Sequence, residues 1–125
     1  MYTNVLLVGN EMKTHMLIVD ILEMTFKNIN IEKATNIQAL FNKLNEQPRY
    51  DLIIIDCQNS KKDDEEVINQ IRIDCPHLID RIIFVFDSIE EKPGEEVLMG
   101  IPCIVKPFSL DEFDALVKRT CSVKR

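Results

Sequence analysis

The stretch YDLIIIDCQNS, residues 50–60, contains the apolar run Leu52 to Ile55 and reaches an aspartate, Asp56, directly after it. Four consecutive apolar residues indicate a strand that is buried on both faces of a parallel sheet. A side chain that follows such a strand lies at the carboxyl end of the strand, where open α/β folds bind their ligands. The stretch therefore predicts an α/β fold and a candidate site residue, Asp56.

The same alternation of strand and helix patterns recurs along the whole chain. Continuous apolar runs at residues 5–8, 82–86 and 103–105 predict three more strands, and the alternating residues 29–34 predict a half-exposed strand at a sheet edge. A helical spacing of apolar residues follows each strand, beginning near residues 11, 35, 63, 88 and 109. Five strands alternating with five helices predict a doubly wound α/β domain, a parallel sheet with helices on both faces.

Local signals give each predicted helix expected boundaries and an expected buried face. Capping boxes are predicted at Thr35 with Gln38 and at Ser109 with Glu112, and the acidic run 63–66 reads as a solvated start of the third helix. Pro93-Gly94 lies inside the fourth helix, which we therefore expect to be short, late or broken. The expected core stripe of the first helix consists of Met12, Met16, Val19, Leu22 and Phe26, with Met24 also in the core.

Composition limits the class of protein. A chain of 125 residues is predicted to form one domain, residues 1–125, and we expect no attached output domain after the last helix. The net charge of -6 argues against a nucleic-acid surface, no apolar run is long enough to cross a bilayer, and no secretory signal precedes the first strand. We therefore expect a cytoplasmic protein whose four cysteines are small core residues and whose partners are proteins.

Two motifs lie fifty residues apart in this fivefold pattern: Asp56 after its buried strand, and the Lys-Pro-Phe step of VKPFSLDEF, residues 105–113. With these motifs the chain resembles a response-regulator receiver domain of two-component signalling along its whole length. The resemblance implies a flavodoxin-like (βα)5 three-layer sandwich with strand order 2-1-3-4-5. It also implies that Asp56 accepts a phosphoryl group from a sensor histidine kinase or a phosphotransfer protein, that Lys106 binds this group, and that the Lys106–Pro107 bond is cis.

The acidic pocket of the family is degenerate in this sequence. Receivers carry two acidic residues after the first strand that hold Mg²⁺, and the corresponding residues here are Gly9 and Asn10. Mg²⁺ prefers hard, anionic oxygen ligands, so we expect at most a weak site. Its expected ligands are Asn10, Glu11, Asp56 and the main-chain carbonyl of Gln58, and no organic cofactor is expected.

The switch positions of the family also differ. Receivers place a Thr or Ser at the end of the fourth strand and an aromatic residue on the fifth, and these positions align with Phe86 and Cys103. Asp87 and Ser88 are adjacent, and a register shift of one or two residues would bring the Ser88 hydroxyl into place. In the unshifted register Asp87 adds negative charge near the phosphoryl group.

Three functions fit these residues. The first is a stand-alone receiver that signals through a downstream protein or a homodimer, and the second is a pseudo-receiver, an interaction module that works without phosphorylation. The third, a small flavodoxin-like enzyme or flavin carrier, fits least, because residues 9–14 lack the Ser/Thr-rich and Gly-rich loop that would cradle a mononucleotide phosphate. His15 and His77 are interpreted as incidental, without a catalytic partner.

Overall fold

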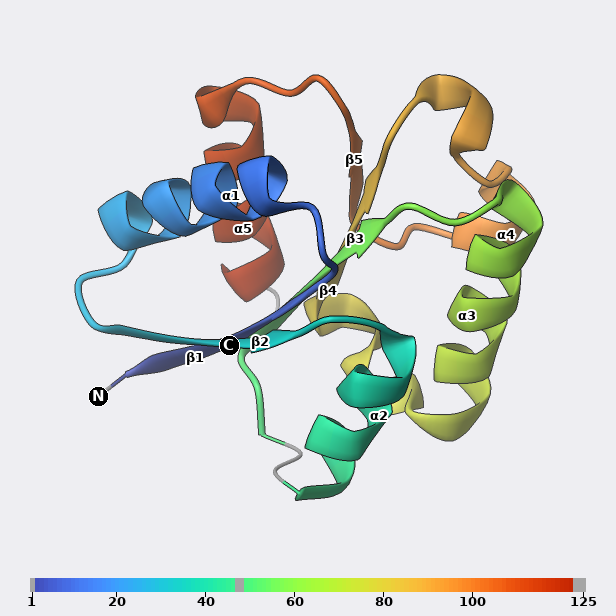
Figure 1. Cartoon of the computed structure of the whole chain (residues 1–125), viewed down its shortest axis with the longest axis horizontal. Helices are drawn as coiled ribbons and strands as arrows, with labels where there is room; N and C mark the ends of the chain where they lie inside the picture. Colours follow the sequence, from blue (N-terminus) through green and yellow to red (C-terminus); the bar gives the residue numbers. More distant parts are fainter. Residues whose placement is uncertain (1, 47–48, 123–125) are drawn as a thin grey trace.

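Five parallel strands form one sheet, in the order β2-β1-β3-β4-β5, in the computed structural model, which describes residues 2–46 and 49–122 (Figure 1). The strands are β1 (Thr3–Val8), β2 (Ile29–Ala34), β3 (Leu52–Cys57), β4 (Ile82–Phe86) and β5 (Cys103–Val105). The helices are α1 (Met12–Thr25), α2 (Ile37–Glu46), α3 (Lys61–Asp74), α4 (Glu95–Leu98) and α5 (Leu110–Ser122), with short 3-10 segments η1 (Pro76–Arg81) and η2 (Ile89–Glu91). The predicted fold class and strand order are confirmed.

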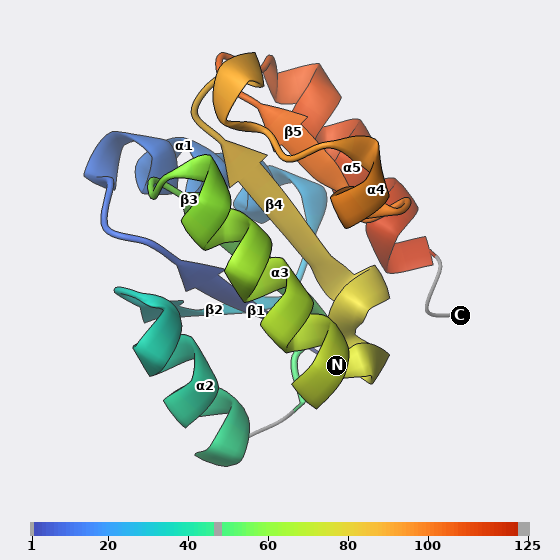
Figure 2. The ribbon, with the colours of Figure 1, turned by 90° about the vertical axis from the view of Figure 1, so that its right-hand side faces the viewer.

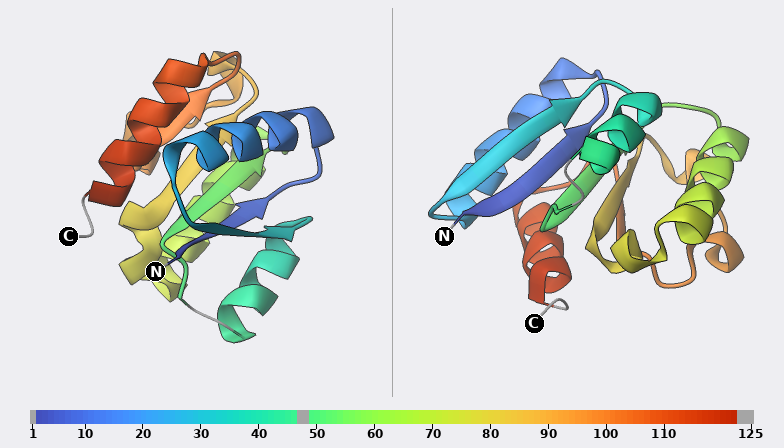
Figure 3. Two further views of the ribbon diagram at one scale, coloured as in Figure 1. Left: turned by 90° about the vertical axis from the view of Figure 1, so that its left-hand side faces the viewer. Right: turned by 90° about the horizontal axis from the view of Figure 1, so that it is seen from below.

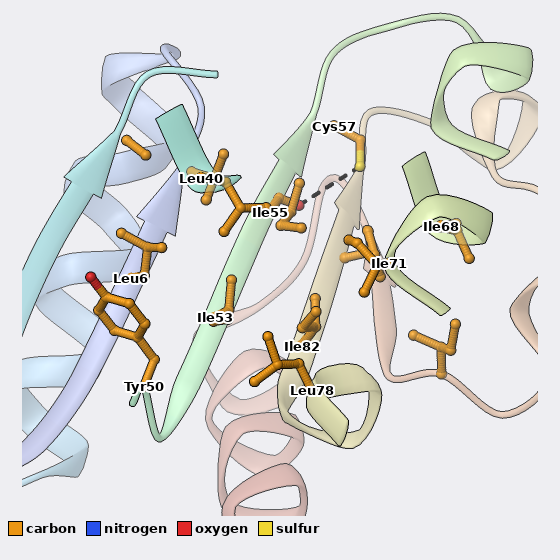
Figure 4. Packing of buried hydrophobic residues seen from close by; sticks show 14 of the residues in the cluster. Leu6, Leu40, Tyr50, Ile53, Ile55, Cys57, Ile68, Ile71, Leu78 and Ile82 are labelled. Carbon is orange, nitrogen blue, oxygen red and sulfur yellow. Dashed lines mark hydrogen bonds between the residues drawn. The ribbon is translucent and has the colours of Figure 1, made fainter. Parts of the chain in front are cut away.

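The helices cover the two faces of the sheet, as Figures 2 and 3 show from opposite sides. Helices α2, α3 and α4 cover one face, and α1 and α5 cover the other. Side chains of β3 alternate between the two cores, because successive residues of a strand point to opposite faces: Ile53 and Ile55 pack under α2 and α3 (Figure 4), whereas Leu52 and Ile54 pack under α1 and α5. The predicted central position of the 52–55 run is thus confirmed.

The buried stripe predicted for α1 is wrong in part. Met12 and Met16 are 73% and 61% exposed, and Met24 is also exposed. The buried residues are instead Thr14, His15, Ile18, Ile21 and Leu22. A helix on a sheet buries one stripe, and the aliphatic side chains at 18, 21 and 22 pack on Val5 and Leu7 of β1. The three methionines therefore lie on the solvent side of the helix.

The start of α2 differs by one residue from the predicted capping box. The side chain of Asn36, not Thr35, accepts the hydrogen bond from the backbone N–H of Ala39, at 2.8 Å. Gln38 donates to Asn42 within the helix instead of closing the box. Asn and Thr both cap helices, and the helix begins at Ile37, which places Asn36 at the capping position.

Replacing Asn36 by alanine is expected to lower the free energy of unfolding by about 1 kcal/mol, because the first turn of α2 loses its side-chain cap. Urea unfolding at neutral pH measures the change. Thr35→Ala is the matched control, since Thr35 is exposed and accepts no capping bond. A larger loss for Thr35→Ala than for Asn36→Ala would contradict this assignment of the cap.

The third helix begins earlier than predicted and buries one of its acidic residues. Ser60 caps α3 by accepting a hydrogen bond from the N–H of Asp63 at 3.2 Å, so the helix starts at Lys61. Asp64 then lies on the same stripe as Ile68 and Ile71 and is only 3% exposed. The interpretation of residues 63–66 as a wholly solvated start is therefore wrong for Asp64.

The last third of the chain follows the prediction more closely. The region of the fourth helix is broken at Pro93-Gly94 into η2 and a four-residue α4, as expected. The Ser109–Glu112 capping box of α5 is confirmed by reciprocal hydrogen bonds of 2.8 and 3.0 Å, although Leu110 points to solvent. Cys57 and Cys121 are buried, whereas Cys75 and Cys103 are half-buried. None of the helices in residues 2–46 and 49–122 is long and apolar enough to span a bilayer.

Candidate functional site

The carboxyl ends of the strands bring Asp56 and Lys106 together as predicted. The Asp56 side chain is fully buried, and Lys106 Nζ lies 3.0 Å from its Oδ1 atom. Lys106 also donates a hydrogen bond to Asp87 Oδ1, at 3.0 Å. The Lys106–Pro107 peptide bond is cis, as expected. One ammonium group thus serves two carboxylates, one buried and one at the surface.

Burial is the largest single influence on the pKa of both Asp56 and Lys106. It raises the pKa of Asp56 above its ordinary value, although the hydrogen bond and charge of Lys106 oppose the shift. Burial alone would lower the pKa of Lys106, but its bonds to Asp87 and Asp56 outweigh burial and the pKa is raised. The lysine therefore stays charged at neutral pH and is the main group that holds the buried Asp56 carboxylate in its ionised form.

A cavity of about 130 Å³ opens beside Asp56 at the ends of β1 and β3. Its polar lining includes Asn10, Asp56, Gln58 and Asp64. The second carboxylate oxygen of Asp56, Oδ2, is buried and has no hydrogen-bond partner among the described residues. The nucleophile proposed from the sequence thus has one carboxylate oxygen that neither Lys106 nor a hydrogen-bond donor among the described residues contacts.

Gly9 and His15 shape the other side of Asp56. Gly9 has a φ of 141°, and a Cβ built on it would lie 2.9 Å from Asp56 Cβ and 2.9 Å from His15 Nε2. His15 itself is buried, with Nε2 unpartnered among the described residues. The His15 imidazole therefore occupies space beside Gly9 that the Cβ of any other residue at position 9 would need. The interpretation of His15 as incidental did not anticipate this buried position beside Gly9.

Glu11 has a different position from the one proposed for a metal ligand. Its carboxylate caps α1, accepting hydrogen bonds from the Thr14 N–H at 2.9 Å and the Thr14 hydroxyl at 2.5 Å. These bonds hold the pKa of Glu11 below its ordinary value. The carboxylate is not part of the lining of the cavity beside Asp56.

The residues present do not suit Mg²⁺. The ion prefers several anionic oxygens in a near-octahedral arrangement. The cavity supplies two carboxyl groups, Asp56 and Asp64, with the neutral Asn10 and Gln58, and Asp64 is only partly ionised at neutral pH because its pKa is raised to about 7. Within residues 2–46 and 49–122, no group of three or more His, Cys, Asp or Glu is arranged to hold a metal ion. The predicted set of Asn10, Glu11, Asp56 and Gln58 is thus reduced further by the capping role of Glu11.

The switch positions lie where the unshifted register places them. Phe86 is the last residue of β4, pairs with Cys57 and Val105, and is fully buried beside Phe84. Cys103 pairs with Phe84, two residues before Phe86. Asp87 leaves the strand end and contacts Lys106, whereas the Ser88 side chain makes no hydrogen bond to another described residue. Asp87 is thus as close to Lys106 as Asp56 is, at 3.0 Å.

Asp64 is a second buried carboxyl group in the same cavity. Burial raises its pKa to about 7, the Cys57 thiol opposes the shift by donating a hydrogen bond, and the charges of Asp63, Glu91 and Asp87 add to it. Its Oδ2 atom has no partner among the described residues. The cavity therefore gains a negative charge as the pH rises through neutrality.

Asp64→Asn is expected to increase the free energy of unfolding by about 2 kcal/mol more at pH 8 than at pH 4, after a discount for solvent screening. The pKa is near 7 in the folded protein but 3.8 ordinarily. The stability that protonated Asp64 provides is therefore lost as the pH rises toward and through 7. Urea unfolding at both pH values measures this difference. Asp63→Asn, at an exposed position, is the control, and an equal effect of Asp64→Asn at both pH values would contradict the assignment.

Comparison with solved structures assigns the architecture. A response regulator from Thermotoga maritima superposes with a TM-score of 0.74 at 21% identity, covering 98% of this chain and 99% of that one. A response regulator receiver domain protein from Clostridium thermocellum gives 0.76 at 14% identity, covering 98% and 96%. The fold is that of receiver domains. An orphan response regulator of H. pylori has the same receiver fold, with a TM-score of 0.70 at 16% identity over 95% of this chain and 96% of that one. No protein-family model and no curated protein matches the sequence.

Sequence reasoning missed two side chains at this edge of the receiver fold, His15 and Asp64. Both carry a signal that a stricter reading of helical spacing detects. His15 precedes Ile18 and Leu22 by three and seven residues, and Asp64 precedes Ile68 and Ile71 by four and seven. A polar residue at these spacings lies on the buried face of its helix. Near a strand end, such a residue is a candidate for the site.

Proposed function

We propose that this chain is a receiver domain in a two-component phosphorelay, which accepts a phosphoryl group on Asp56 and signals through protein contact. One observation carries the proposal. A buried carboxylate ends the central strand of a receiver fold, paired at 3.0 Å with a lysine that follows the last strand. Phosphoryl transfer depends mainly on positioning and charge stabilisation, and Lys106 supplies a cation beside the nucleophile.

The proposal also defines the partners. The donor is a sensor histidine kinase or a phosphotransfer protein, and the receiver of the signal is another protein or a second copy of this chain. Residues 1–125 act as one cytoplasmic domain in this proposal, as a phosphoacceptor and not as an enzyme with a diffusible substrate. Mg²⁺ binding is weak, since Asn10, Asp56 and the Gln58 carbonyl are the remaining oxygen ligands.

Incubation with acetyl phosphate, followed by intact-protein mass spectrometry, tests the proposal. The wild type is expected to gain a phosphoryl adduct and Asp56→Ala to gain none. A well-behaved receiver labelled in parallel shows that the reagent is active. If the folded wild type gains no adduct under conditions that label this receiver, the phosphoacceptor function fails.

The second candidate function is the pseudo-receiver. It is favoured by the contact of Asp87 with Lys106, because this contact places a fixed negative charge next to the lysine without any phosphoryl group. The pseudo-receiver predicts that wild type and Asp56→Ala capture the same partner with equal affinity. The phosphoacceptor predicts that acetyl phosphate changes the affinity of the wild type alone.

A further inference from the structure

His15 Nε2 and Asp56 Cβ both lie next to Gly9, which follows the strand after which receivers place their acidic residues. The position of a Cβ on Gly9 would be 2.9 Å from both His15 Nε2 and Asp56 Cβ, so the glycine is what allows the two side chains to approach. His15 Nε2 and Asp56 Oδ2 are both buried and both without a hydrogen-bond partner among the described residues. Two unpaired polar atoms in one buried place indicate a site for a further group, because an unpaired buried polar atom is costly.

The chemistry of these atoms favours an anion. A neutral imidazole has one N–H donor. Lys106 Nζ lies 3.0 Å from Oδ1, the other oxygen of the Asp56 carboxylate. Burial lowers the pKa of His15, against the opposing effect of the Asp56 charge, so the ring is neutral at pH 7.5. The Asp56 charge favours the tautomer of His15 that carries the proton on the ring nitrogen nearer to Asp56. A donor and a cation thus lie next to the carboxylate, whereas no group of three or more His, Cys, Asp or Glu in residues 2–46 and 49–122 is arranged to hold a metal ion.

We propose that the Nε2–H group of His15 takes over the phosphoryl-binding role of the divalent cation, so that Asp56 is phosphorylated without a metal ion. This inference rests on the proposed phosphoacceptor function. His15 donates a hydrogen bond to one oxygen of the phosphoryl group on Asp56, and Lys106 binds another. His15 neither gains nor loses a proton in the step.

With acetyl phosphate the step balances as a simple displacement. Asp56 Oδ2 attacks phosphorus and forms the new O–P bond, while the bond between phosphorus and the acetate oxygen breaks and acetate leaves with the electron pair. The aspartyl phosphate carries the two negative charges that the donor phosphoryl group carried. Lys106 and the His15 N–H then compensate this charge inside a buried site, where such donors contribute most.

The test measures the rate of phosphoryl adduct formation from acetyl phosphate, with EDTA or with Mg²⁺, in four proteins. Wild type is expected to be labelled at similar rates under both conditions. His15→Leu, which keeps the bulk but removes the donor, is expected to be labelled on the order of 10- to 100-fold more slowly. His15→Gln, whose amide nitrogen reaches a similar position, is expected to recover most of the rate. His77→Leu is the matched control, since His77 is exposed.

A second measurement uses the wild type alone and so does not depend on the folding of a variant. The chain contains two histidines, so protein labelled with ¹⁵N-histidine gives two imidazole spin systems in NMR spectra. In the presence of EDTA, phosphorylation of Asp56 is expected to shift the Nε2 resonance of His15 and to leave that of His77 in place.

The outcomes separate the two proposals. The role of His15 would be overturned if labelling of Asp56 requires Mg²⁺ and either the rate is unchanged in His15→Leu or the His15 resonance does not shift. The phosphoacceptor function would then remain intact. An absence of labelling in wild type under all conditions, or labelling that persists in Asp56→Ala, overturns the phosphoacceptor function and the role of His15 with it.

Discussion

Lys106→Met is expected to lower the free energy of unfolding by on the order of 3 kcal/mol at pH 8. The Asp56 side chain is fully buried, and the lysine is the cation 3.0 Å from it. Methionine keeps the apolar stem but removes the charge, so the Asp56 carboxylate remains buried without a counter-ion. Urea unfolding at pH 8 and pH 5 measures the effect.

The loss should be smaller at pH 5 than at pH 8. Burial raises the pKa of Asp56, and Lys106 opposes this rise, so the pKa rises further in Lys106→Met. A carboxyl group with a raised pKa stabilises the folded state while it is protonated, and this stability is lost as the pH rises through the pKa. The variant therefore loses less stability under acidic conditions, because burying a neutral carboxyl group costs less free energy than burying a charged one.

Two further variants isolate the ion pair. In an Asp56→Asn background, Lys106→Met should cost much less, since no buried charge is left unpaired. Asp87→Asn is the matched control, because it removes the other partner of Lys106. The Asp87 side chain is 48% exposed, and its loss should cost less than about 1 kcal/mol. If Lys106→Met costs as much in the Asp56→Asn background as in the wild type, the lysine acts by packing alone.

The fold follows from features that a single sequence carries. The continuous apolar run before Asp56 fits a strand buried on both faces, and the alternating residues 29–34 fit a strand at the edge of the sheet. The pattern of apolar residues alone therefore predicted how each of these strands is buried. The order of the strands was implied by the resemblance and not by periodicity. The face of α1 was predicted wrongly because methionine and isoleucine at neighbouring positions offer two overlapping apolar stripes, of which the one with Ile18, Ile21 and Leu22 is buried.

The residues of the site were predictable at the carboxyl ends of strands and were missed in the first turns of helices. Asp56 is the penultimate residue of β3 and Lys106 directly follows β5, so topology alone brings them to one edge of the sheet. His15 and Asp64 come from the first turns of helices, and whether they face the sheet depends on the helix start. That start was set by side-chain caps, Glu11 for α1 and Ser60 for α3.

Gly9→Ala is expected to lower the free energy of unfolding by on the order of 3 kcal/mol or more. Gly9 has a φ of 141°, which is strained for any residue with a Cβ, and the new methyl group would lie 2.9 Å from both Asp56 Cβ and His15 Nε2. Urea unfolding measures the loss. Gly100→Ala is the matched control, since Gly100 also has a positive φ, 82°, but open space around its Cβ position. Gly100→Ala should cost about 1 to 2 kcal/mol, from backbone strain alone.

The difference between the two glycine variants reports the contact of position 9 with His15 and Asp56. Equal losses would mean that strain explains both and that the His15 ring is free to move away. A larger loss at Gly9 means that His15 and Asp56 do not move apart to admit the new methyl group. In that case, Gly9→Asp cannot restore the acidic pocket of the family, because the new side chain would have to displace His15 first. The glycine and the histidine then form one replacement for the acidic pair, since His15 approaches Asp56 only where position 9 has no side chain.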